Sequence, residues 1–148
     1  MSKDSITSLL VDCVNIAYDL QSQQLKCTKF DFLSVSELHV LEAITLEKEA
    51  TMTNVANRLL ITVGSLTTAI NKLILKGVVE RSRHEEDHRI VILKLTKSGQ
   101  DALALHQEIH EAIDDVIYDC IEPEMVEWVN DTIKEISKRL NDIKDTYK

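Results

Sequence analysis

The first part of the chain repeats apolar residues with a helical period. Within residues 5–26 the apolar side chains recur at steps of three and four, which predicts an amphipathic helix. The stretch SVSELHVLEAITLE continues with a second helical pattern, for which Ser34 or Ser36 is the N-cap. The chain therefore begins with two helices in succession.

Two shorter helical patterns follow. TMTNVANRLL predicts a short helix capped by Thr53. ITVGSLTTAINKLILKG predicts another, which starts at Thr62 and stops at Gly77, a residue that commonly ends helices. A short helix, a turn and a second helix indicate a helix-turn-helix, in which the second helix enters the major groove of DNA.

The period then changes from helix to strand. VVERS and RIVILKLT are short and β-branched, and the polar turn RHEEDH joins them, so they predict a two-stranded hairpin. Thr96 caps a long helix over about 97–120, and Pro123 suits the start of a final helix. This order predicts a mainly α fold with a small β-hairpin: a winged helix-turn-helix on a helical dimerisation platform.

The two ends of the chain are expected to form a dimer. The last helix carries apolar residues at alternating four- and three-residue steps, and no third layer remains to cover both it and the first helix. Within a single domain of 1–148, we assign 1–34 and 97–148 to dimerisation and 35–96 to the winged helix-turn-helix. The residues predicted at the interface are Ile6, Leu9, Leu10, Val129, Ile133, Ile136, Leu140 and Ile143.

Charge changes this picture, because it is unevenly spread. The net charge is −8, yet residues 51–99 hold eight Lys and Arg against four Asp and Glu. A basic centre between acidic ends predicts that the centre meets a polyanion. The balance of 44% hydrophobic and 28% charged residues is that of a globular protein, and no signal peptide or membrane span is evident. We therefore expect a cytoplasmic protein.

Helix 62–77 and the hairpin hold the candidate DNA contacts. Asn71 can read adenine in bidentate fashion, and Lys72 can reach a phosphate or guanine. Arg89 suits the narrow minor groove, where Asp87 would hold its guanidinium in a fixed fork. A solvated polar face is the alternative, and the adjacent hairpin favours DNA. The predicted DNA-binding residues are Gly64, Ser65, Thr67, Thr68, Asn71, Lys72, Arg81, Arg83, Asp87, His88 and Arg89.

The segment DHRIVILKLTKSG, with LILKGVVERS before it, resembles the signature of the MarR family of bacterial transcription regulators. The resemblance covers nearly the whole chain. It implies an obligate homodimer, a winged helix in each subunit and a pseudo-palindromic operator. In the family, the residue matching Asp87 orients the arginine matching Arg89, which enters the minor groove. Many members carry Arg where this chain has Thr68, so its base contacts are expected to be weaker or different.

A narrower resemblance concerns one branch of the family. The pair Thr67–Thr68, with SELHVLEAI before it and LHQEIHEAI after it, resembles the fatty-acid-synthesis repressors of streptococci and their relatives. That branch implies repression of fatty-acid synthesis genes, with acylated acyl carrier protein as co-repressor. The carrier protein is acidic and needs a basic landing site, for which Lys26, Lys29 and the edge of the winged helix are the candidates.

Three histidines form the candidate effector pocket. His106 and His110 are four residues apart on one helical face, the spacing of a metal-binding pair. Zinc-uptake repressors of the same family use histidines at these positions and at His39, with a carboxylate where this chain has Gln21. The lipid-responsive branch shares the three histidines, so we assign them to an effector pocket without metal or cofactor. A zinc-responsive repressor is the alternative.

The cysteines and the absence of catalytic motifs complete the analysis. Cys13, Cys27 and Cys120 are odd in number and widely spaced, which predicts buried free thiols. Cys13 lies roughly where peroxide-sensing members keep a reactive thiol, so redox sensing is a lesser alternative, although its apolar surroundings argue against it. No phosphate-binding glycine loop or Ser/His/Asp arrangement is present, so no enzyme is expected. A helical interaction protein that does not bind DNA is a further alternative.

Overall fold

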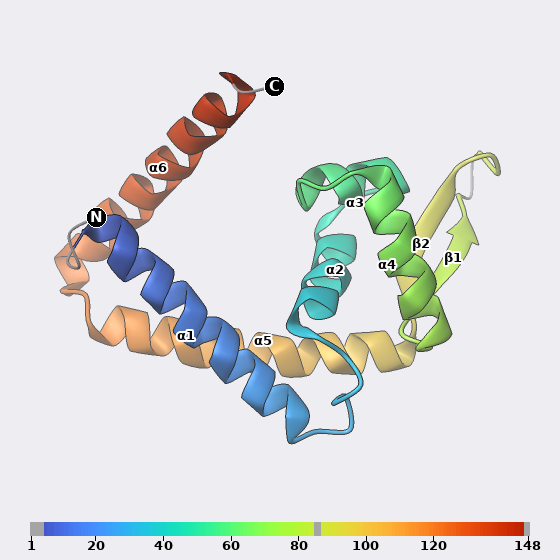
Figure 1. Ribbon diagram of the computed structural model, residues 1–148, viewed down its shortest axis with the longest axis horizontal. Coiled ribbons are helices and arrows are strands. Elements are labelled where there is room, and N and C mark those ends of the chain that lie inside the picture. Colours follow the sequence, from blue (N-terminus) through green and yellow to red (C-terminus); the bar gives the residue numbers. More distant parts are fainter. Residues whose placement is uncertain (1–4, 85–86, 147–148) are drawn as a thin grey trace. The chain divides into compact units, whose positions relative to one another are not determined.

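The computed structural model describes residues 5–84 and 87–146 (Figure 1). By internal contacts the chain divides into two compact units, Met1–Ile109 and His110–Lys148. The predicted mainly helical fold with one small hairpin is confirmed. The elements are α1 (Ile6–Lys26), α2 (Val35–Leu46), α3 (Met52–Arg58), α4 (Val63–Leu75), β1 (Val79–Arg83), β2 (Val91–Leu95), α5 (Lys97–Asp119), a 3₁₀ turn (Pro123–Met125) and α6 (Val126–Thr146).

The N-caps of α2 and α3 show how local polar residues start the helices. Ser34 caps α2 through a capping box, in which its hydroxyl accepts from the Glu37 N–H and the Glu37 carboxylate accepts from the Ser34 N–H. The cap of α3 is Thr51, whose hydroxyl accepts from the Asn54 N–H. The prediction of Thr53 was wrong, because pairing of Ala50 and Thr51 with β2 fixes the chain in an extended conformation just before the helix.

Helices α3 and α4 end in the same backbone arrangement, a Schellman motif. After α4, the N–H groups of Gly77 and Val78 donate back into the last turn, and Gly77 has a φ of 72°, as its predicted role requires. After α3, the same bonds come from Leu60 and Ile61, and Leu60 has a φ of 56°. A left-handed leucine costs about 1–2 kcal/mol relative to glycine. This tight turn sets α3 and α4 at 106° to one another.

The core of the first unit lies between the helix-turn-helix and the hairpin. Leu66, Ile70 and Leu73 form the inner face of α4 and are completely buried. The hairpin is antiparallel, with Val79 opposite Leu95 at its base and further pairs up to Arg83 opposite Val91. Its Leu93 belongs to the same core, so α4 and the hairpin are packed against one another.

The Leu-Thr-x-x-Gly part of the signature joins three elements. Thr96 caps α5 by accepting from the Gly99 N–H at 3.1 Å, and its hydroxyl donates to the Gly77 carbonyl at 2.7 Å. A Cβ on Gly99 would lie 2.0 Å from the carbonyl oxygen of Val78, so only glycine lets α5 approach the end of α4 this closely. This half of the signature is therefore architectural.

The second unit consists of the end of α5, the 3₁₀ turn and α6. Pro123 begins the 3₁₀ turn, and α6 itself starts at Val126, slightly later than predicted. None of the described residues of α6 is buried, and its apolar side chains are largely exposed. In the described residues, no single helix is long and apolar enough to cross a membrane; α3 and α4 reach that threshold only when combined.

Candidate nucleic-acid interface

The outer face of α4 is formed by residues opposite its buried face. Counted at 100° per residue from the buried Leu66, Ile70 and Leu73, the outward side of α4 carries Gly64, Thr68 and Asn71, and Leu75 at its C-terminal end. Ser65 and Lys72 lie beside them, and all of these outward residues are exposed. Five of the six predicted contacts on this helix thus lie on one accessible surface, and the sixth, Thr67, is half-buried at its side.

Hydrogen bonds within α4 decide what its hydroxyl groups can offer. Thr67 donates its hydroxyl proton to the Val63 carbonyl at 2.8 Å, and Thr68 donates to the Gly64 carbonyl at 3.3 Å. With their protons used inside the helix, both threonines present methyl groups and acceptor lone pairs. Such groups complement a thymine methyl or a base amino group in the major groove.

Gly64 is the second residue of α4, and the packing around it would allow a larger side chain. A Cβ there would meet only the Thr62 hydroxyl oxygen, at an ordinary contact distance of 3.9 Å. It lies in the first turn, where helix N–H groups attract phosphate. The smallest side chain therefore leaves room on the outside of the helix.

Asn71 does not stand alone on this face. Its side-chain oxygen accepts a hydrogen bond of 2.8 Å from Nη2 of Arg81 in β1. Bidentate adenine reading uses this same oxygen as an acceptor, so Arg81 occupies one of its two lone pairs, and adenine reading by Asn71 stays a prediction. The sequence shows no sign of this bond, because the partners lie on different elements that meet only in the folded unit.

The wing turn differs from expectation at Asp87 and Arg89. The Asp87 carboxylate accepts the backbone N–H of Arg89 at 3.0 Å, and no ion pair between their side chains occurs in the described part of the turn. A separation of two residues in a tight turn brings the backbone amide to the carboxylate first, as in an Asx turn. Arg83, His88 and Arg89 are exposed, and Asp87 shapes the turn that carries Arg89.

An ion pair holds the C-terminal end of α4 to the start of α2. The Lys76 ammonium lies 2.7 Å from both carboxylate oxygens of Glu37 and donates to the Phe32 carbonyl. Burial raises the pKa of Glu37, but hydrogen bonds from Lys76 and Ser34 and the charge of Lys76 outweigh it and hold that pKa below its usual value. Sequence reasoning missed this clamp, since 39 residues separate the two charges.

The candidate effector residues His39 and His106 meet in the first unit. Their ring centroids are 5.2 Å apart, and His106 is almost completely buried. His110 follows one turn later on α5, on the same helical face. Two surface grooves of about 380 Å³ and 340 Å³ flank His39, the second between α2 and the turn after α3.

Comparison with known proteins identifies the family. A model of the MarR family matches residues 33–90. The chain is similar in structure to FabT of Streptococcus pneumoniae in complex with DNA, with 30% identity, a TM-score of 0.83, and coverage of 93% of this chain and 96% of that one. The chain belongs to the MarR family. The family prediction is confirmed, as is the expectation of no enzyme, because MarR proteins are transcription regulators.

Two further relatives support the MarR fold. MepR of S. aureus, also in complex with DNA, has a TM-score of 0.76 at 17% identity, with coverage of 91% of this chain and 98% of that one. The HTH-type transcriptional regulator SarZ of Staphylococcus haemolyticus is 34% identical over 67 residues, 45% of this chain and 46% of that regulator. This chain thus matches about half of the length of that curated relative.

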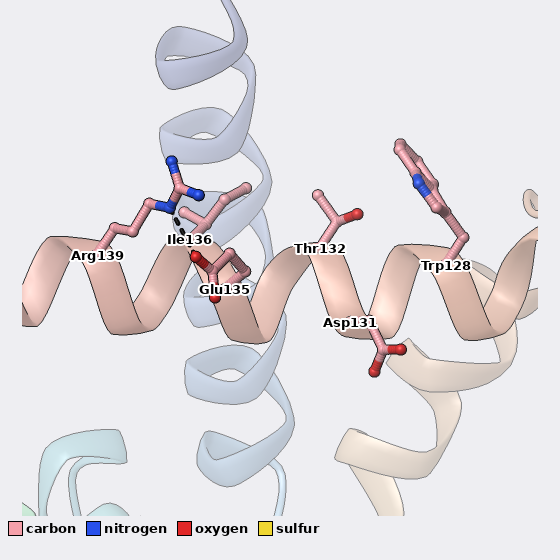
Figure 2. A pocket seen from close by; sticks show the side chains of 6 residues that line it. All are labelled: Trp128, Asp131, Thr132, Glu135, Ile136 and Arg139. Carbon is pink, nitrogen blue, oxygen red and sulfur yellow. Dashed lines mark hydrogen bonds and ion pairs between the residues drawn. The ribbon is translucent and has the colours of Figure 1, made fainter.

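In the described residues, the first and last helices of this MarR chain expose apolar side chains. The N-terminal half of α1 exposes Ile6, Leu9 and Leu10. On α6, Figure 2 shows Trp128, Thr132 and Ile136 along one side, where they line a groove of about 430 Å³ together with flanking charged side chains. Of the predicted interface residues on α6, Ile133, Ile136, Leu140 and Ile143 are exposed and Val129 is half-buried. Trp128, 60% exposed, was missed because it lies beside the predicted stripe.

The cysteines of the MarR chain were predicted to be buried, and this was wrong. Cys13, Cys27 and Cys120 are all exposed, because each lies on the outer surface of α1, just after it, or at the end of α5. Both candidate landing residues for a carrier protein, Lys26 and Lys29, are exposed, and the ammonium of Lys29 lies 5.0 Å from the centre of the Phe30 ring.

Proposed function

We propose that the protein is a homodimeric, DNA-binding transcriptional repressor that controls fatty-acid synthesis genes. One observation carries the DNA-binding part: α4 exposes Gly64, Ser65, Thr68, Asn71 and Lys72 and shares its core with a hairpin that exposes Arg81, Arg83 and Arg89. The acidic remainder of the chain repels DNA, so this surface is where a duplex would dock. FabT, 30% identical over 93% of the chain, is a relative seen in complex with DNA.

The dimer is supported by the exposed apolar faces at both ends. A monomer rarely exposes a contiguous apolar surface of this kind, and a coiled-coil-like stripe on α6 suits a second helix. A twofold dimer would present two copies of α4 to two half-sites about one helical turn apart. This agrees with a pseudo-palindromic operator.

Acylated acyl carrier protein is the co-repressor that we propose, with His39, His106 and His110 in the pocket that senses it. The support is the similarity to FabT and the grooves beside His39. A zinc-responsive repressor is a second candidate, favoured by the contact of His39 with His106 and by the position of His110. Imidazoles at such positions suit zinc, which takes three protein ligands and a water.

For zinc, α1 offers Gln21 as the nearest match to the carboxylate of the family's zinc repressors. Gln21 is buried, and its side-chain oxygen has no hydrogen-bond partner among the described residues. An amide oxygen is a weaker zinc ligand than a carboxylate. The donor set therefore fits zinc only in part, and lipid control is the first proposal.

Fluorescence anisotropy on a labelled promoter of the organism's own fatty-acid synthesis operon tests both proposals. Arg89→Ala should weaken binding by about tenfold or more, because it removes a charge-assisted contact in the minor groove. Lys134→Ala removes the same charge from the exposed surface of α6 and should leave binding unchanged. Equal affinities of all three proteins at physiological salt would contradict the role of the wing.

The same titration separates the two effectors. Tightening by long-chain acyl carrier protein, with no response to zinc or chelator, would support lipid control. Tightening by zinc alone, lost in His106→Gln, would make the histidines metal ligands and leave the DNA-binding proposal standing.

A further inference from the structure

The contact between Arg81 and Asn71 has consequences for base reading. Arg81 lies opposite Leu93 in the hairpin, and directly opposed residues project from the same face of a sheet. Leu93 is buried, so this face is turned toward the helices. The hairpin thus directs the Arg81 side chain along the core toward α4, where it reaches Asn71.

The orientation of the Asn71 amide follows from the partner. A guanidinium only donates hydrogen bonds, so the atom of Asn71 that faces Arg81 must be the oxygen. Because Asn71 is exposed, its amino group remains open to a partner from outside the protein. Arg81 therefore fixes which end of the amide is available to a partner.

The electrostatics of the pair follow from this geometry. Asn71 reads adenine when its oxygen accepts from N6 while its amino group donates to N7. Here a positive guanidinium 2.8 Å from that oxygen draws on its lone pairs and repels the positive hydrogens of the adenine amino group. The Asn71 oxygen keeps a second lone pair, but the Asn71 amino group and the remaining N–H groups of Arg81 surround it with donors. In the major groove, guanine presents two acceptors side by side, N7 and O6.

We propose that Arg81 and Asn71 act as one reading unit that selects guanine at one position of each half-site, with Arg81 setting the preference of Asn71. This proposal rests on the DNA-binding function proposed above. Without Arg81, no positive charge stands beside the Asn71 oxygen, and the same asparagine prefers adenine. Arg81 therefore determines which base is selected, in addition to attracting DNA through its positive charge.

Selection from a library of random duplexes tests the reading unit, because it requires no operator of established sequence. The wild-type protein and the Arg81→Ala, Asn71→Ala and Arg83→Ala variants are each used to enrich bound sequences. The position where Asn71→Ala loses its preference identifies the base that Asn71 reads. At that position, wild type should select guanine and Arg81→Ala should select adenine, while Arg83→Ala, which removes the same charge from the same strand, should keep guanine.

Binding to the two duplexes that differ at this position gives the magnitude. Wild type should bind the guanine duplex about tenfold more tightly, the usual size of one base contact, and Arg81→Ala should reverse the order. Adenine selected by wild type, the same base selected by wild type and Arg81→Ala, or no change in Asn71→Ala would each overturn the inference. In those cases wild type still enriches a sequence, whereas failure of wild type to enrich any sequence would overturn the proposed function itself.

Discussion

Replacing Gly64 with alanine should raise stability and lower DNA affinity at the same time. The new Cβ has only one neighbour, the Thr62 hydroxyl at 3.9 Å, so it causes no steric cost in the folded protein. Alanine is favoured over glycine within helices by about 0.5–1 kcal/mol. For a chain of this size, that corresponds to a rise in Tm of about 1–4 °C.

The loss of DNA affinity follows from where the methyl group points. Gly64 lies on the face of α4 opposite the core, so the added methyl would stand between the helix and a docked duplex. Displacing one or two hydrogen bonds of about 0.5–1.5 kcal/mol each weakens binding by roughly tenfold. The assay pairs thermal unfolding followed by circular dichroism with anisotropy on the same operator duplex.

Gly99→Ala is the matched control, because it places the same methyl group where the structure has no room. A Cβ at Gly99 would lie 2.0 Å from the Val78 carbonyl oxygen, so α5 must shift and stability should fall by about 1–3 kcal/mol. A Gly64→Ala protein that binds the operator as wild type does would refute the placement of this turn against DNA. A Gly64→Ala protein that melts below wild type would refute the packing argument.

Two further outcomes are expected. The carboxylate of Glu37 has a folded pKa below its ordinary 4.5, so its bond to Lys76 stabilises the protein above that pH and is lost as pH falls through the folded pKa. Urea unfolding should therefore show the Glu37→Gln variant less stable than wild type by about 1–3 kcal/mol at pH 7, and this difference should shrink toward pH 3. A difference that stays constant with pH would contradict the ion pair. A chain that ends before Val129 lacks nearly all of α6 and should be monomeric by light scattering, whereas a truncated dimer that binds DNA would exclude α6 from the interface.

The family and the order of elements could be predicted because they depend on local signals. Helical periodicity, the switch to alternating β-branched residues and caps such as Ser34 and Thr62 each act within a few residues. The signature around Thr96 and Gly99 was also visible in the sequence, although its reason was not. That reason is the fit of α5 against the carbonyls of Gly77 and Val78.

The predictions that were wrong or missing concern residues whose surroundings are formed by segments far away along the chain. Thr53 was predicted as a cap because the pattern cannot show that β2 pairs with Ala50 and Thr51. Buried thiols were predicted from the number and spacing of the cysteines, which do not determine burial. Cys13, for example, lies on α1, which turns most of its apolar side chains outward.

By itself, the sequence determined which segments are helical, where the wing lies and which residues are able to meet DNA, since these depend on the spacing and chemistry of neighbouring residues. The tertiary structure decided how those residues are used. Asn71 and Arg81 are ten positions apart, and Lys76 and Glu37 are thirty-nine. Their bonds exist only because the core around Leu66 and Leu93 packs α4 against the hairpin and α2. A side chain's hydrogen-bond partner depends on that packing, and the partner decides what the side chain has left to offer a base.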